Sequence, residues 1–254
     1  QKEHAFLSIA FFHIEGGFHF RKIGNKRVTV ATGVNLFTGI QLAPTMAELQ
    51  LKSDANVSAD YTTISNLEVD AVDFVLTNAN AFVGYGNPDF SKSLKDQDIY
   101  GLSLSDVDLA FTMMSLTYGL SSFPEFYALK GSAAGIELHT GSDFFELSTG
   151  RIEFGFNRGD NWNGTEFEPV VDFTTSKDFQ DPTGAAHGLK LEVGGETVNI
   201  DHGGAPYMGV AVSDALLKIG GFIYVSGNLA IQKADAGFFN IKSLVANYNN
   251  VGMD

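Results

Sequence analysis

Apolar and polar residues alternate along most of the chain, a pattern that predicts β-strands with one buried face. Between residues 5 and 31 the alternation breaks at Glu15–Gly17 and at Gly24–Asn25, where we expect the tight turns of an antiparallel meander. Residues 137–156 and 189–200 each predict a further pair of strands joined by a glycine-containing turn. Amphipathic helical periodicity is nearly absent, so the pattern predicts an all-β protein.

Two stretches leave alternatives open. Residues 46–51 fit one helical turn, but the alternation of Ala47, Leu49 and Leu51 fits a strand equally well. Residues 67–76 resemble residues 102–111, which favours a β-layer built unit by unit, as in a solenoid. Ordinary similarity between two strands is the alternative explanation.

A longer internal repeat organises the whole chain. The segment 215–233 repeats the segment 5–22 when one gap is opened opposite Ile223. Equivalent pairs include Ala5 with Ala215, Leu7 with Leu217, Ile9 with Ile219, Phe12 with Phe222, Gly16 with Gly227 and Lys22 with Lys233. A period of roughly 210 residues indicates a tandem module, whereas two unrelated apolar hairpins in one domain are the alternative.

The repeat predicts domain boundaries and an interface. We expect residues 1–31 to be the tail of a preceding repeat, 32–214 the body of one repeat and 215–254 the start of the next. An isolated unit would expose apolar strands at both ends, so we expect it to associate end to end through residues 5–31 and 215–241. The predicted interface residues are Phe6, Ile9, Phe12, Phe18, Phe20, Leu217, Ile219, Phe222, Val225 and Ile231.

Composition excludes several classes of protein. The 30 acidic and 16 basic residues give a formal net charge of −14, which should repel nucleic acid. The chain has no cysteine, so disulfides, thiolate zinc sites and thiol catalysis are excluded. Because apolar runs are short, we also expect no transmembrane helix.

One acidic segment predicts a cation site. Asp96, Asp98 and Gly101 reproduce the opening of a D-x-D-x-x-G loop, in which alternate carboxylates point at one hard cation. Asp106 and Asp108, from the next strand, would supply further ligands. The later positions of the loop depart from the EF-hand pattern, so we expect a structural calcium site of another kind. The alternative is a solvated acidic loop.

Catalytic motifs are missing from the sequence. The six histidines lack the spacing of zinc enzymes, and no nucleophile elbow, phosphate-binding loop or dinucleotide fingerprint occurs. We therefore expect a protein that is not an enzyme. Two alternatives remain. One is a carbohydrate-binding or glycoside-cleaving β-sandwich, with Trp162, Tyr118 or Tyr207 as a sugar platform. The other is a lipid-handling β-groove lined with phenylalanine.

Three segments carry a family resemblance. Residues 101–111 read G-L-x-L-S-x-x-D, residues 127–130 read Y-A-L-K, and residues 221–233 read G-F-x-x-V-S-G ending in lysine. In this order they resemble the long tandem repeats of very large bacterial surface or secreted proteins of the giant adhesin type. The resemblance covers roughly residues 70–240, and none of its motifs is catalytic.

The resemblance implies an elongated antiparallel β-layer, a solenoid-like tandem repeat unit with little or no helix. It further implies an extracellular or cell-surface fibre or stalk whose partners are like repeat units, with glycans or matrix as further partners.

Overall fold

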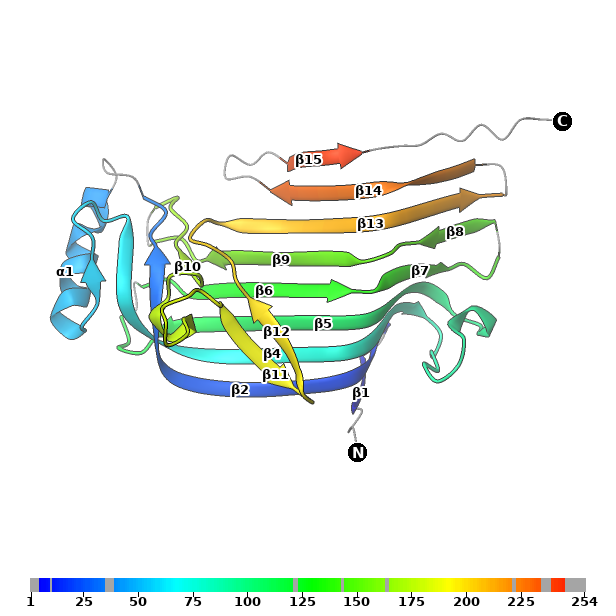
Figure 1. The fold of residues 1–254 in the computed structure, drawn as a ribbon, viewed down its shortest axis with the longest axis horizontal. Helices are drawn as coiled ribbons and strands as arrows, with labels where there is room; N and C mark the ends of the chain where they lie inside the picture. The colour runs from blue at the N-terminus through cyan, green and yellow to red at the C-terminus, as the bar shows by residue number, and fades with distance from the viewer. Residues whose placement is uncertain are drawn as a thin grey trace.

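The chain forms one wide antiparallel sheet with a compact cap at one end (Figure 1). The computed structural model describes residues 5–9, 11–34, 39–120, 123–142, 144–162, 165–220, 223–233 and 239–244. Strands dominate these residues, which confirms the all-β prediction. None of the helices found in them is long and apolar enough to cross a membrane.

The main sheet is a meander in which neighbouring strands are antiparallel. Its strands lie in the order β1 (Ala5–Ile9), β2 (Phe12–Ala31), β4 (Thr63–Tyr85), β5 (Tyr100–Leu116), β6 (Phe126–Ala133), β9 (Ile152–Gly159), β13 (Tyr207–Ile219), β14 (Ile223–Lys233) and β15 (Phe239–Leu244). Two short strands continue the sheet beyond β6 and β9. β7 (Gly135–His139) follows β6 along the chain and, like β6, pairs with β5. β8 (Phe145–Ser148) precedes β9 and, like β9, pairs with β13.

The remaining elements gather at one end of the sheet and over one of its faces. They are the 3-10 helix η1 (Gly39–Leu42), α1 (Ala43–Lys52), β3 (Asn56–Val57), β10 (Val170–Asp172), the 3-10 helix η3 (Lys177–Phe179), β11 (Leu189–Val193) and β12 (Glu196–Ile200). A further 3-10 helix, η2 (Leu94–Asp96), lies in the connection from β4 to β5. The β11–β12 hairpin lies across β4, β5 and β6, and we call the face it covers the hairpin face (Figure 1). The opposite face is the open face.

The ambiguous stretch at 46–51 belongs to a helix. Met46 and Leu49 are both fully buried, whereas Leu51 is exposed, so burial follows the helical spacing of three rather than strand alternation. Pro44 in the first turn suits a helix start, because the N–H that it lacks would have no partner there.

Residues 12–31 form the single strand β2, and both expected turns fall at β-bulges of the β2–β4 pair. Beside Glu15–Gly17 the extra residue lies in β4, where Asn78 has φ 48°, and at Gly24–Asn25 it lies in β2. The register against β4 shifts between Glu15 and Gly17 and again between Ile23 and Lys26. A bulge absorbs one extra residue without reversing the chain, and it favours Gly or Asn, which tolerate left-handed backbone angles. Asn25 has φ 57°, as such a bulge requires. The prediction of two turns was therefore wrong, because bulges and turns select the same residues.

The larger hydrophobic core lies at the capped end, on the hairpin face, and a smaller cluster around Leu76, Ala79 and Val107 lies on the open face. Val28, Val30 and Leu67 pack in the larger core with Trp162, and all four side chains are buried. The Trp162 indole N–H donates a 2.8 Å hydrogen bond to the carbonyl oxygen of Thr32, which satisfies the polar atom of this buried ring. The cap is thus an ordinary globular core.

Candidate assembly interface

The two copies of the internal repeat form the same hairpin. The equivalent cross-strand pairs are Ala5–Gly16 with Ala215–Gly227, Leu7–Ile14 with Leu217–Val225, and Ile9–Phe12 with Ile219–Ile223. The alignment gap falls in the turn, because residues 10–11 join the first hairpin and residues 220–222 join the second. Phe12 therefore corresponds to Ile223 rather than to Phe222, which lies outside the described residues. A likeness in sequence is thus also a likeness in strand pairing.

The first strands of the two hairpins are an even number of steps apart in the sheet. β13 lies six steps from β1 along the order β1-β2-β4-β5-β6-β9-β13. In an antiparallel sheet an even number of steps restores the strand direction. β13 therefore runs in the same direction as β1 and occupies the equivalent place, with β14 in the place of β2.

The two hairpins differ in how far their first strand extends. β13 continues past the hairpin and covers β14 with the pairs Val212–Leu229, Ala211–Ala230, Val210–Ile231, Gly209–Gln232 and Met208–Lys233. The residues of β2 equivalent to 229–233 are Phe18–Lys22. No described strand pairs with β2 on that side between Gly16 and Thr29. We call Phe18–Lys22 the open edge.

Elsewhere the same edge of β2 is closed. β10 pairs with Thr29–Ala31, and the backbone N–H of Thr29 also donates to the Ser176 hydroxyl at 2.9 Å. The backbone N–H of Arg27 donates to the Asp178 carboxylate, again at 2.9 Å. Among the described residues, this edge is thus closed at the capped end and has no partner strand at Phe18–Lys22.

Side-chain exposure follows this difference. Phe20 is 65% exposed and Phe18 is 43% exposed at the open edge. Their equivalents Ile231 and Leu229 are half-buried, because β13 lies beside them. A covering strand therefore changes the environment of these positions.

Two cross-strand ladders define an apolar band on the open face. The first ladder joins Phe20, Phe74, Phe111, Leu129, Phe156 and Met208 in direct register. The second joins Phe18, Leu76, Leu109, Gly131, Phe154, Val210 and Ile231. Glycine is needed in the second ladder, since a Cβ at Gly131 would lie 2.6 Å from Cε2 of Phe154. We call these two ladders, with their apolar neighbours along each strand, the apolar band.

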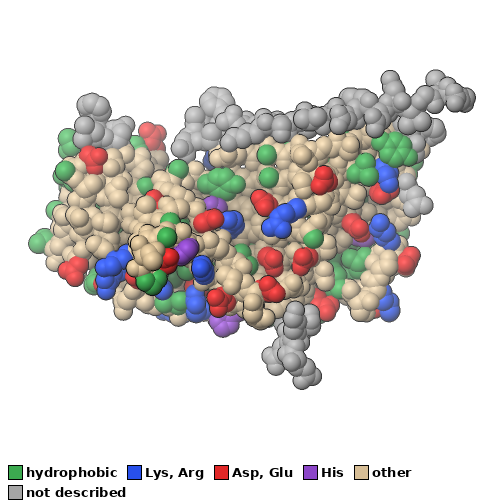
Figure 2. Space-filling model, in the orientation of Figure 1, with side chains coloured by type: hydrophobic (Ala, Val, Ile, Leu, Met, Phe, Trp, Pro, Cys, Tyr) green, Lys and Arg blue, Asp and Glu red, His purple; other side chains and the backbone are tan. Residues whose placement is uncertain are grey.

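The hairpin face of the same strands is polar beyond the cap. Arg21, Asp73 and Thr112 are direct neighbours there, and the Asp73 carboxylate accepts hydrogen bonds from Thr112 at 2.8 Å and from Arg21 at 2.9 Å. Figure 2 shows acidic and basic side chains spread over this face. The sheet is therefore amphipathic, with its polar side toward the covering hairpin.

The predicted interface residues lie at the two edges of the sheet. Phe6 is exposed on β1, and Phe12 is half-buried on β2 beside it. Leu217, Ile219 and Val225 are half-buried in the second hairpin. The side chain of Ile9 lies outside the described residues, as does Phe222. The sequence related the two hairpins to each other, but it did not reveal that the described residues cover one copy and not the other. Their role as an interface stays a prediction.

The predicted calcium ligands divide between two hollows. Asp96 and Asp98 line a hollow of about 590 Å³ near His139 and Glu146. Asp108 lines a different hollow, and its carboxylate accepts a 3.0 Å hydrogen bond from the backbone N–H of Asn78. Across the described ranges, no three Asp, Glu or His side chains lie close enough together to share a metal ion. Calcium binding stays a prediction.

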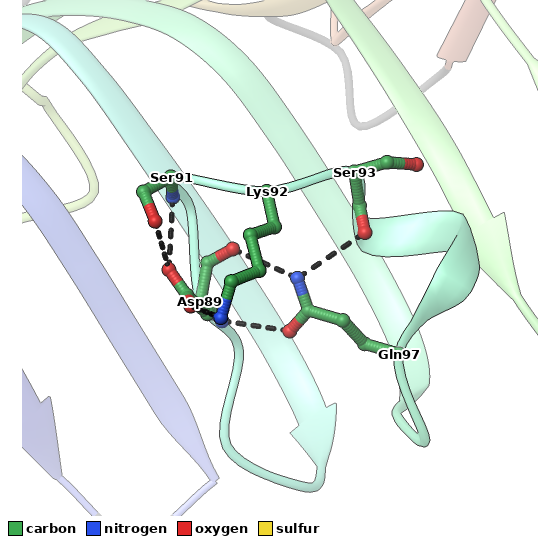
Figure 3. Close-up of polar contacts among 5 residues, drawn as sticks. All are labelled: Asp89, Ser91, Lys92, Ser93 and Gln97. Carbon is green, nitrogen blue, oxygen red and sulfur yellow. Dashed lines mark hydrogen bonds and ion pairs between the residues drawn. The ribbon is translucent and has the colours of Figure 1, made fainter.

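Asp106 occupies a bulge of β5, where its φ is 50°. Asp89, close to the predicted ligands in sequence, has other partners. Its carboxylate makes an ion pair of 2.7 Å with Lys92 and accepts from the backbone N–H of Ser91 (Figure 3). The side-chain amide of Gln97 holds the loop by donating to the Asp89 carbonyl oxygen at 2.8 Å. Lys92 and Ser91 lower the pKa of Asp89 from 3.8 to about 2.

The hairpin face holds a polar hollow of about 430 Å³ between β12 and the sheet. Lys130 and Asp201 form an ion pair of 2.6 Å at its wall, and the rings of His202 and Tyr207 lie 5.1 Å apart. Burial lowers the pKa of His202, which favours the neutral imidazole. Tyr207 lies close over Gly209, because a Cβ there would be 2.6 Å from the tyrosine oxygen. The hollow thus offers polar groups beside a flat ring.

The other two aromatic residues predicted as sugar platforms, Trp162 and Tyr118, do not line the polar hollow. Trp162 is buried in the cap, so its ring presents no surface to a sugar. Tyr118 is exposed at the end of β5, and its hydroxyl donates to Glu68. Of the three aromatic candidates, Tyr207 alone lines the polar hollow.

Comparison with protein families, with characterised proteins and with solved structures finds no significant match to this chain.

Proposed function

We propose that this chain is a structural unit of an extracellular or cell-surface fibre or stalk, in which like units join edge to edge into one continuous sheet. The observation that carries the proposal is the pair of matched hairpins, one with its edge covered by β13 and one with the equivalent edge open. In such an array residues 1–31 belong to the sheet of the preceding unit, residues 32–214 form the body, and residues 215–254 begin the next unit.

The proposed joint is specific in register. Within each chain Met208–Val212 is already paired with β9 on one side and with residues 229–233 on the other. The joint therefore forms by strand exchange, in which Phe18–Lys22 of one unit takes the place of residues 229–233 beside Met208–Val212 of its neighbour. Backbone hydrogen bonds along the open edge supply the affinity, as in other cases of strand addition. Because β13 and β1 run in the same direction, each added unit presents the same edge again. The array extends without reversing its strands.

Cysteine cross-linking tests the joint. The register places His19 of one unit directly opposite Ala211 of the next, at the Cα separation of about 5 Å that a disulfide bridges. The native chain has no cysteine, and both positions are exposed. A mixture of His19→Cys and Ala211→Cys chains should therefore form a disulfide-linked pair under mild oxidation.

The matched control moves one residue along β13. A Val210→Cys side chain projects from the opposite face, so it should not link to His19→Cys. Equal yields from the two mixtures, or no linked pair from the first, would overturn the proposed joint.

Glycan binding in the polar hollow is a second candidate function. It is favoured by the position of Tyr207 beside Lys130, Asp201 and His202, since sugars bind flat rings and paired polar groups together. A Tyr207→Ala chain should lose signal on a glycan array, whereas Tyr118→Ala, a tyrosine outside the hollow, should keep it. Equal signals from both variants would remove this candidate.

A further inference from the structure

The described part of the chain covers only the centre of the apolar band, where Leu76 and Val107 are buried in a small cluster, and leaves its outer members exposed. Phe18, Phe20, Val72 and Met208 all rank among its exposed large side chains. The elements that pack on the sheet, β11 and β12, lie on the other face. An apolar surface of this extent, exposed to water, marks a site of contact with an apolar partner.

The shape of the band identifies the partner. Along the strands it has two polar borders. One border contains Lys22, Tyr127 and Arg158, which lie one ladder beyond the phenylalanines. At the other border Tyr85 and Tyr100 pair directly where β4 and β5 meet their connection. Across the strands the second ladder has no polar border, since it reaches from Phe18 at the open edge to Ile231 on β14, whereas the first ladder ends at Met208, opposite Lys233.

A protein interface is a patch, with a polar rim all round its apolar centre. A lipid bilayer is instead an apolar slab bounded on two sides, with tyrosines and cations favoured at its boundaries. On β5 the apolar open-face positions run from Leu102 to Met113, roughly 35 Å along the strand, which a tilted strand needs to cross a hydrocarbon layer of about 30 Å. The band has the borders and the width of a lipid contact.

We propose that the apolar band is covered by the acyl chains of a phospholipid bilayer. This goes beyond the edge joint, because it concerns open-face side chains rather than backbone groups at the edge. The two proposals are compatible, since backbone groups in hydrocarbon must be paired and a neighbouring strand would pair those of Phe18–Lys22. The net charge of −14 favours a zwitterionic lipid over an anionic one.

Flotation with phosphatidylcholine vesicles tests the proposal. The full chain should float with the vesicles, and Phe20→Glu should weaken binding by roughly tenfold, because it places a charge in the band. Phe20 is exposed, so this change leaves the core intact. Ile231→Glu, at the equivalent position of β14, should act in the same way.

The control is Gln232→Glu, which adds the same charge to the hairpin face one residue away and should float as the unchanged chain does. Failure of the unchanged chain to float, or equal flotation of all variants, would overturn the proposal. Stronger binding to phosphatidylglycerol vesicles would assign binding to Lys22 and Arg158 instead of the band. A lipid-free dimer that Phe20→Glu dissociates and vesicles do not would identify a second copy as the cover. None of these outcomes depends on the cross-linking result.

Discussion

The capped end and the open sheet are built from the same long strands, yet they place their apolar residues on opposite faces. In β4, Leu67, Val69 and Ala71 are buried on the hairpin face, while Glu68 and Asp70 face the other way. From Val72 onward apolar residues also occupy the open face, at Val72, Phe74 and Leu76, while the hairpin face carries Asp73 and the buried Val75. The difference shows that one strand can bury apolar side chains on one face in one region and present them on the opposite face in another, when its alternation of apolar and polar residues shifts.

Because of this shift, the apolar side chains of the two regions are covered differently. At the cap the apolar side meets α1, β10 and the β11–β12 hairpin, and it forms a closed core. In the open sheet the apolar side buries a small cluster around Leu76 and Val107, but the described residues place no second layer of strands or helices over the rest of it. The cap therefore has the features of a self-sufficient fold, and the open sheet has those of a surface completed by partners.

Trp162→Ala should have the largest effect on stability. It removes a buried ring and leaves the Thr32 carbonyl without its donor, so we expect a loss of about 3–5 kcal/mol in the free energy of unfolding. Urea unfolding measures this loss. Phe20→Ala in the open sheet is the matched aromatic control, for which we expect less than about 1 kcal/mol. Equal losses would remove the distinction between the two regions.

Asp73→Ala tests the boundary itself. Asp73 follows the shift in alternation directly, and its side chain is 3% exposed while Arg21 is 40% exposed. Arg21 can regain water, but the buried Thr112 hydroxyl loses its acceptor, so we expect a loss of about 1–3 kcal/mol. Glu153→Ala, which breaks the exposed pair with Arg151, should cost less than about 0.5 kcal/mol. A cost for Asp73→Ala as small as that for Glu153→Ala would contradict this account.

Asp89→Asn should have the smallest effect, and its effect should depend on pH. Because folding lowers the pKa of Asp89 from 3.8 to about 2, the ionised carboxylate stabilises the loop above pH 3.8. That contribution is lost as the pH falls through about 2. The unchanged chain should therefore lose more stability than Asp89→Asn between these pH values in thermal melts. If the melting temperatures of the two chains fell equally over this pH range, the ion pair of Asp89 with Lys92 would not stabilise the protein.

Much of the strand content followed from the sequence, because alternation is a local signal. The matched hairpins were also predictable, since the two segments keep equivalent residues at paired positions. The bulges of the β2–β4 pair were not, because Gly24–Asn25 suits a turn and a bulge equally. Helix α1 was not predictable either, because it is short and its few apolar residues fit both the helical spacing and the alternation of a strand.

The candidate site was harder to predict than the strands. The predicted interface residues lie on the two matched hairpins. The open edge depends on which strand pairs with which, and that is a property of the sheet. The sequence also did not show on which face of the sheet the phenylalanines lie, because the alternation of apolar residues changes along β4. A shift from Leu67-Val69-Ala71 to Val72-Phe74-Leu76 was the available signal in the sequence.

Amide hydrogen exchange tests the edge joint most directly. If like units join as proposed, the backbone amides of Phe18–Lys22 that point away from β4 should gain protection as the protein concentration rises. Those of Thr29–Ala31, already paired with β10, should not change. Exchange at Phe18–Lys22 that is independent of concentration would contradict the account.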